Sequence, residues 1–150
     1  MKMTGEEFED LIEKEPSWCK NLKKPLEVTT YVNLTHSPIT HLSPFITFTG
    51  ENEAGWGADF SYCEKLEIAE CNSINPVAFG HSGIKEVRNL KIKQTSGGGW
   101  NGDLFNCKNL ISVPLEYTSG NWRLEKAKIK KSITKYAVDK IKAEANNLKI

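Results

Sequence analysis

The residues of this 150-residue chain that most often do chemistry are four cysteines and three histidines. A cysteine nucleophile needs an imidazole base and a carboxylate that orients the base. One such set can be written from Cys71, His81 and Asp103. No nucleophile-elbow motif accompanies these residues. We therefore expect no catalytic residue, and a small cysteine hydrolase using Cys71 remains only an alternative.

Metal and phosphate sites have little support in the sequence. The cysteines and histidines form no C-x-x-C or H-x-x-x-H pair, which are common spacings for zinc ligands. The glycine run at 97–99 lacks the Lys-Ser/Thr pair that completes a phosphate-binding loop. We expect neither a metal ion nor a cofactor.

Two tryptophans are candidate binding residues. Trp56 and Trp100 each lie seven residues before a cysteine, at the end of a glycine-containing insertion. As buttresses they would fold back and fill the outer groove of the structure. As anchors they would project from neighbouring loops, where tryptophan often dominates binding energy at interfaces. Both interpretations remain open.

The cysteines belong to an internal repeat. C-x-x-L units begin at Cys19, Cys63 and Cys107, at intervals of 44 residues. A second series, in which Ser37 and Ser82 take the place of cysteine, lies between them, so that successive units are 18, 26, 19 and 25 residues long. Units of this length cannot bury a core alone, and chains built from them stack the units into a solenoid.

The repeated segments resemble a known family. Phe60-Ser-Tyr-Cys63-Glu-Lys-Leu66 and Leu104-Phe-Asn-Cys107-Lys-Asn-Leu110 are similar to the BspA-type leucine-rich repeat. The resemblance implies an α/β fold, a short leucine-rich-repeat solenoid with a parallel sheet. Short apolar strands are expected at Leu66-Glu67-Ile68 and at Ile84-Lys85-Glu86-Val87. Such repeats serve many kinds of partner, so the resemblance implies little about the ligand.

Both ends of the chain have the pattern of a helix. Thr4-Gly-Glu-Glu7 is a capping box ahead of Phe8 and Ile12, which predicts an N-terminal cap helix within residues 1–17. Apolar residues from Ile133 to Leu148 recur at i, i+4 and predict a C-terminal helix over 133–150. We expect a single domain over 1–150, with the repeat solenoid at 18–132 between two caps.

The repeat also predicts the state of the thiols and a binding face. Cysteines two turns apart are separated by about 9.6 Å, beyond the roughly 7 Å that a disulfide allows between Cα atoms. They are expected to be small packing residues, whereas Cys71 lies outside the series and is predicted to be a half-buried or a reactive surface thiol.

Outward positions of the predicted sheet form a row of mixed charge, which suits a protein surface better than phosphates. Its members are Thr40, His41, Glu67, Lys85, Glu86 and Arg88.

Charge limits the remaining function classes. The net charge is +1, which excludes a generally basic nucleic-acid binder. Residues 123–150 nevertheless carry a net +6, either as a solvated helix face or as a polar partner surface. Nucleic-acid binding through Lys126 to Lys149, with Trp122 available to stack, is therefore an alternative.

The expected function is non-catalytic. The sequence has no secretory signal and no apolar run long enough to cross a membrane, so a cytoplasmic location is expected. We expect a protein–protein interaction module, either an adaptor or a stoichiometric inhibitor, for example of a phage type. Its partner would be another protein, bound by the sheet face and the tryptophan-bearing loops.

Overall fold

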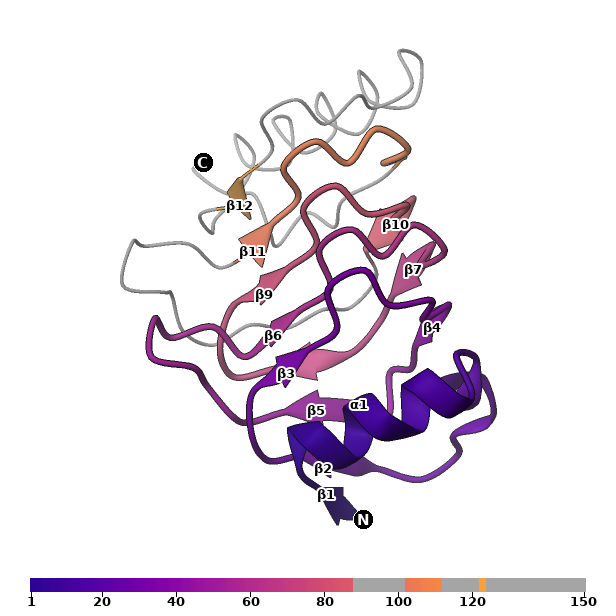
Figure 1. Ribbon diagram of the computed structural model, residues 1–150, viewed down its shortest axis with the longest axis vertical. Helices are drawn as coiled ribbons and strands as arrows, with labels where there is room; N and C mark the ends of the chain where they lie inside the picture. The colour runs from indigo at the N-terminus through magenta and orange to yellow at the C-terminus, as the bar shows by residue number, and fades with distance from the viewer. Residues whose placement is uncertain (88–101, 112–121, 124–150) are drawn as a thin grey trace, which may run out of the picture.

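The computed structural model describes residues 1–87 and 102–111, and the backbone of residues 122 and 123. This part of the chain is an α/β structure (Figure 1). It contains an α-helix, α1 (Gly5–Lys14), a 3-10 helix, η1 (Trp18–Asn21), and strands of two or three residues. Every strand pair found among these residues is parallel.

The strands of the described residues form three sheets. The first sheet contains β1 (Lys2–Met3), β2 (Leu26–Val28), β5 (Ile46–Phe48) and β8 (Asn72–Ser73). The second contains β3 (Val32–Asn33), β6 (Ala58–Asp59), β9 (Val77–Ala78), β11 (Gly102–Asp103) and β12 (Trp122–Arg123). The third contains β4 (His41–Leu42), β7 (Ile68–Ala69) and β10 (Glu86–Val87). From β2 to β10 the chain visits the three sheets three times in the same order, so that neighbouring strands come from successive passes (Figure 1).

The pairing register follows the sequence repeat. In the second sheet Val32 pairs with Ala58, Ala58 with Val77, and Val77 with Gly102. These partners are 26, 19 and 25 residues apart, the same offsets that separate Ser37, Cys63, Ser82 and Cys107 in the sequence. Over this range the predicted unequal unit lengths are confirmed, because they equal the numbers of residues that separate paired positions in the second sheet.

A recurring turn follows the strands of the second sheet. The side chains of Asn33, Asp59 and Asp103 accept a hydrogen bond from the N–H two residues later, at 3.2, 2.9 and 2.7 Å. The next residue has a left-handed backbone, with φ between 56° and 62°. The residues in this conformation are His36, Tyr62, His81 and Asn106. The small repeat residue comes directly after it, where the chain turns toward the core.

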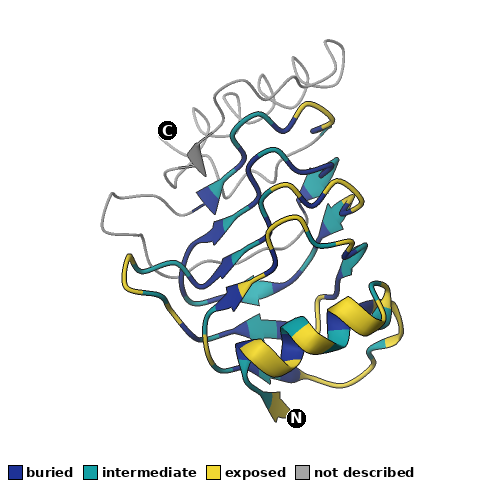
Figure 2. Ribbon diagram, in the orientation of Figure 1, coloured by how far each residue is buried: buried dark blue, intermediate teal, exposed yellow. Residues whose placement is uncertain are grey.

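The core is a continuous apolar column. Phe8 of α1 packs edge-on against Phe48, and Phe60 lies between Phe48 and Phe79, with each pair of ring centroids 5.7 Å apart. All four rings are fully buried, and buried residues follow the strands along the structure (Figure 2). Each pass thus contributes apolar side chains that only the neighbouring pass can cover.

Helix α1 lies at the N-terminal end of this column. The hydroxyl of Thr4 accepts from the N–H of Glu7, and the Glu7 carboxylate accepts from the N–H of Thr4, both at 3.1 Å. This capping box and the buried Phe8 and Ile12 confirm the helix expected near the N-terminus. The helix expected over 133–150 lies outside the described residues.

Both expected strands begin two residues later than the sequence predicts, and the one expected at Ile84-Lys85-Glu86-Val87 is β10, Glu86–Val87. The strand expected at Leu66-Glu67-Ile68 is β7, Ile68–Ala69, and its inward residue is the fully buried Ala69, whereas Ile68 is only half-buried. Simple alternation from Leu66 places Ile68 inside, but the chain has not yet entered the sheet at Leu66.

Among the described residues, no helix is long and apolar enough to cross a lipid bilayer.

Candidate functional site

The third sheet carries the candidate binding face. Its strands align His41 with Ile68 and Ile68 with Glu86. These three residues are half-buried, whereas the residue after each of them is buried against the core. The outer side of the sheet is therefore a row of three side chains, one from each pass of the chain.

Thr40, Glu67 and Lys85 directly precede the three strands, and an ion pair joins Glu67 and Lys85. The backbone N–H of Lys85 donates to the carbonyl of Glu67 at 2.7 Å, and Nζ of Lys85 lies 3.1 Å from Oε1 of Glu67. On the neighbouring pass, Oγ1 of Thr40 lies 2.7 Å from Nδ1 of His41. Of the six residues predicted for this face, His41 and Glu86 lie in β4 and β10. Thr40, Glu67 and Lys85 directly precede β4, β7 and β10, and Arg88 lies outside the described residues.

Ile68 is the residue of this face that the sequence analysis missed. It lies in the middle strand, between His41 and Glu86. A signal for it was available in the sequence. The buried residues Ile39 and Leu42 are three apart, as are Ile84 and Val87, and the same spacing from Leu66 selects Ala69 for the core and leaves Ile68 outside.

Trp56 lies away from the third sheet. It belongs to the loop that connects β5 to β6, and this loop lies on the opposite side of the view in Figure 1 from β4, β7 and β10. Asn52 closes this loop: its side-chain oxygen accepts from the N–H of Trp56 at 2.9 Å, and its own N–H donates to the Trp56 carbonyl at 2.8 Å. The indole is half-buried, which is compatible with either role, and Trp100 lies outside the described residues.

All four cysteines are free and buried, with at most 1% of the residue exposed. The thiol of Cys63 donates to the carbonyl of Leu34 at 2.9 Å, and that of Cys107 to the carbonyl of Phe79 at 3.0 Å. Sγ of Cys107 also lies 3.7 Å from Oγ of Ser82. A serine on the adjacent pass therefore faces a repeat cysteine, as expected if the repeat cysteines lie two passes apart.

Cys71 is fully buried, so the expectation of a half-buried or surface thiol is wrong. Its position between β7 and β8 places it where the chain passes from the third sheet to the first, against the core. Burial raises the pKa of Cys71, and it raises the pKa of Cys19 and Cys63 to about 12. A nucleophilic cysteine needs the opposite, a lowered pKa and access to solvent.

The imidazole that a hydrolase would need is engaged elsewhere. Nδ1 of His81 lies 2.8 Å from Nδ2 of Asn106. His81 follows β9 of the second sheet, whereas Cys71 lies between strands of the third and first sheets.

Within the described residues no three His, Cys, Asp or Glu side chains are grouped as metal ligands would be.

A stack of rings runs along the left-handed turn positions. The rings of His36 and Tyr62 are 4.6 Å apart and within 9° of parallel, and those of Tyr62 and His81 are 4.5 Å apart and within 3°. Phe105 meets His81 edge-on at 5.2 Å. The equivalence of His36 and His81 predicted a structural role, but Tyr62 between them was missed because it matches neither histidine in type.

Comparison with known proteins assigns no relative. No protein-family model, no curated protein and no solved structure matches this chain significantly.

The basic segment from Lys126 to Lys149 lies outside the described residues.

Proposed function

We propose that this chain is a non-catalytic protein-binding module, an adaptor or a stoichiometric inhibitor, that binds its partner through the outer face of β4, β7 and β10. The observation that carries the proposal is the register of His41 with Ile68 and Glu86. It brings together residues that are 27 and 18 positions apart in the sequence.

The proposal includes a finer description of the fold, a short solenoid of BspA-type leucine-rich repeats. Its support is the repeated visit to three parallel sheets and the burial of Leu66 and Leu110, each three residues after a repeat cysteine. Because such units depend on their neighbours for burial, the outer faces of the sheets are the surfaces free to evolve toward a partner.

The composition of the face favours a protein partner. An apolar side chain, Ile68, lies at its centre, with an imidazole on one side and a carboxylate on the other. Protein interfaces commonly combine a small apolar centre with a polar rim. Lys85 and Glu67 balance each other across the face, whereas a surface that binds phosphates needs an excess of basic groups.

The burial of Cys71 counts against the hydrolase alternative. With its thiol inaccessible and its pKa raised, Cys71 cannot attack a substrate without local unfolding. The nucleic-acid alternative depends on Lys126 to Lys149, and a gel-shift assay at low salt tests it.

The decisive experiment exchanges the charges of the exposed ion pair between Glu67 and Lys85. In the double variant Glu67→Lys/Lys85→Glu the pair is retained, so the fold is preserved while the charge pattern presented to a partner is reversed. Capture from native lysate with the unaltered protein first identifies a stoichiometric partner, and its affinity for the double variant is then measured. We expect a loss of about tenfold or more, as for central interface residues.

Glu6→Lys is the matched control, because Glu6 is exposed in the first turn of α1, at the opposite end of the helix from Pro16, whose carbonyl accepts from the N–H of Thr40 on the face. It should leave the affinity unchanged. If the double variant and Ile68→Asp both bind the partner as tightly as the unaltered protein, the third sheet is not the binding face.

A further inference from the structure

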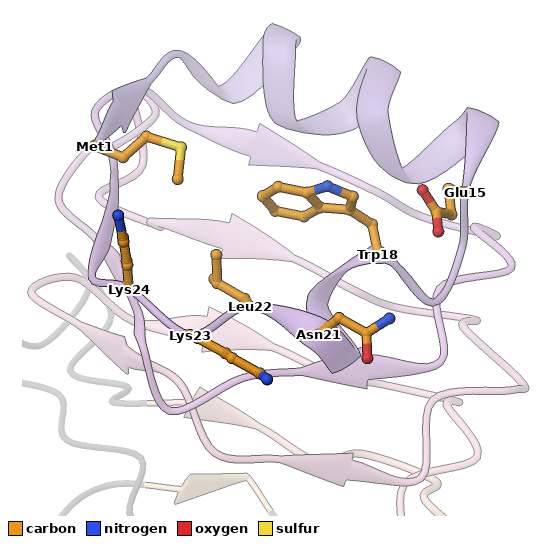
Figure 3. A pocket seen from close by; sticks show the side chains of 7 residues that line it. All are labelled: Met1, Glu15, Trp18, Asn21, Leu22, Lys23 and Lys24. Atoms are coloured by element: carbon orange, nitrogen blue, oxygen red, sulfur yellow. The ribbon is translucent and has the colours of Figure 1, made fainter.

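A hollow of about 340 Å³ lies at the N-terminal end of the molecule, between α1, η1 and the segment that leads into β2 (Figure 3). It is separate from the outer row of the third sheet, since none of the face residues lines it. Trp18, Leu22 and Met1 supply its apolar walls.

The apolar walls face solvent as well as the core. Figure 3 shows the indole of Trp18 extending into the hollow, with Met1 and Leu22 directed toward the same space. Trp18 and Leu22 are half-buried against the hydrophobic core, and Met1 is 62% exposed. A rigid indole backed by the core and open to solvent is the type of group that anchors a partner's apolar side chain, because little side-chain freedom is lost on binding.

The charges at the rim select the partner. Lys23 and Lys24 line one side of the hollow, and Lys20 precedes them; all three are exposed. The ion pairs seen in the described part of the chain, Lys2–Glu27 and Lys85–Glu67, involve none of these lysines. Glu15 lies across the hollow from Lys23 and Lys24 (Figure 3), so one side of the rim is basic and the other carries a single carboxylate.

We propose that this hollow is a docking site for an acidic protein segment, which inserts one apolar side chain against Trp18 and places its carboxylates beside Lys23 and Lys24. The basic side of the rim steers an acidic segment toward the hollow and fixes its direction. The apolar side chain supplies the affinity by displacing water from the indole and from Leu22. This site is additional to the face of the third sheet, and neither proposal depends on the other.

The test uses an array of eight-residue peptides with a central Leu, Ile, Phe or Met flanked by acidic residues. Each has a counterpart flanked by lysines and a counterpart with a central Ser. The protein carries Trp56→Phe, Trp100→Phe and Trp122→Phe, so that Trp18 alone reports binding by fluorescence. We expect at least one acidic apolar peptide to bind about tenfold more tightly than both counterparts, and its affinity to fall as salt rises.

Four variants test whether the peptides bind at the hollow. Lys23→Glu/Lys24→Glu changes two exposed residues without touching the core, and it should weaken binding about tenfold or more. Trp18→Ala, made in the protein that keeps Trp56, Trp100 and Trp122, should also weaken the binding measured by calorimetry. Trp18→Phe in the same protein should bind more tightly than Trp18→Ala. Glu67→Lys/Lys85→Glu, on the third sheet, should leave peptide binding unchanged.

The inference is overturned if no acidic apolar peptide binds better than its basic counterpart, or if the lysine variant binds the peptides normally. It is also overturned if a short oligonucleotide binds this site in preference to every peptide, because the lysines would then serve a nucleic acid.

Discussion

The reactivity of the four thiols is the sharpest available test of the buried repeat. Burial raises the pKa of Cys19 and Cys63 to about 12, whereas an unperturbed cysteine has a pKa of about 8.5. At pH 8 an unperturbed thiol is therefore about one-quarter thiolate, but a thiol with a pKa of about 12 is thiolate in only about one molecule in ten thousand. Because the thiolate is the reacting form, the native thiols of Cys19 and Cys63 should react at least about 1,000-fold more slowly than the unfolded ones.

The assay measures the absorbance released by an aromatic disulfide reagent at pH 8, with and without guanidinium chloride. All four cysteines are buried, so we expect no fast phase in the native protein and four equivalents of thiol after unfolding. Mass spectrometry after alkylation identifies the first residue to react. A native thiol that reacts within about tenfold of its unfolded rate would refute the reasoning, and if that thiol were Cys71, the hydrolase alternative would regain support.

Three further predictions concern stability, each measured by urea denaturation. Tyr62→Ala should lower the free energy of unfolding by about 1–3 kcal/mol, because the ring stacks on an imidazole on each side. Tyr62→Phe keeps the ring and should lower it little. Equal losses in the two variants would contradict a role for stacking. Gly83→Ala should lower the free energy of unfolding by about 1–3 kcal/mol, because the new Cβ would overlap the backbone carbonyl of Glu64. Gly80→Ala is its control, since the nearest atom to its Cβ would be 3.7 Å away. The raised pKa values of Cys19 and Cys63 predict that each contributes stability that is fully present below about pH 8.5 and is lost toward pH 12, at about 1.4 kcal/mol per pH unit. Cys63→Ala should reduce this slope, and an unchanged slope would contradict the cause.

Local signals in the sequence predicted the elements that depend on neighbouring residues. The capping box at Thr4 and the apolar residues that follow it were sufficient to predict α1, because its first turn is stabilised by side chains within four positions. The spacing of the small repeat residues likewise predicted the pairing offsets of the second sheet, since a chain that returns to the same sheet must place equivalent residues in register.

Features that depend on contacts between passes of the chain were not predictable in this way. Ile68 and Ala69 are both apolar, and only the point at which the chain enters the third sheet decides which one faces the core. Tyr62 completes the ring stack although it differs from both histidines, because the turn requires a left-handed residue rather than a particular ring. The hollow around Trp18 is formed by α1, η1 and the segment leading into β2 together, and no single one of these shows it.

The sequence by itself determined the repeat, its unequal units and the N-terminal helix. These properties follow from spacing along one chain, which is visible without any knowledge of neighbours. Only the tertiary structure decided the full burial of Cys71, the outward position of Ile68 and the opening beside Trp18. Each of these depends on what a neighbouring pass of the chain covers, and coverage is a property of packed surfaces rather than of residue order.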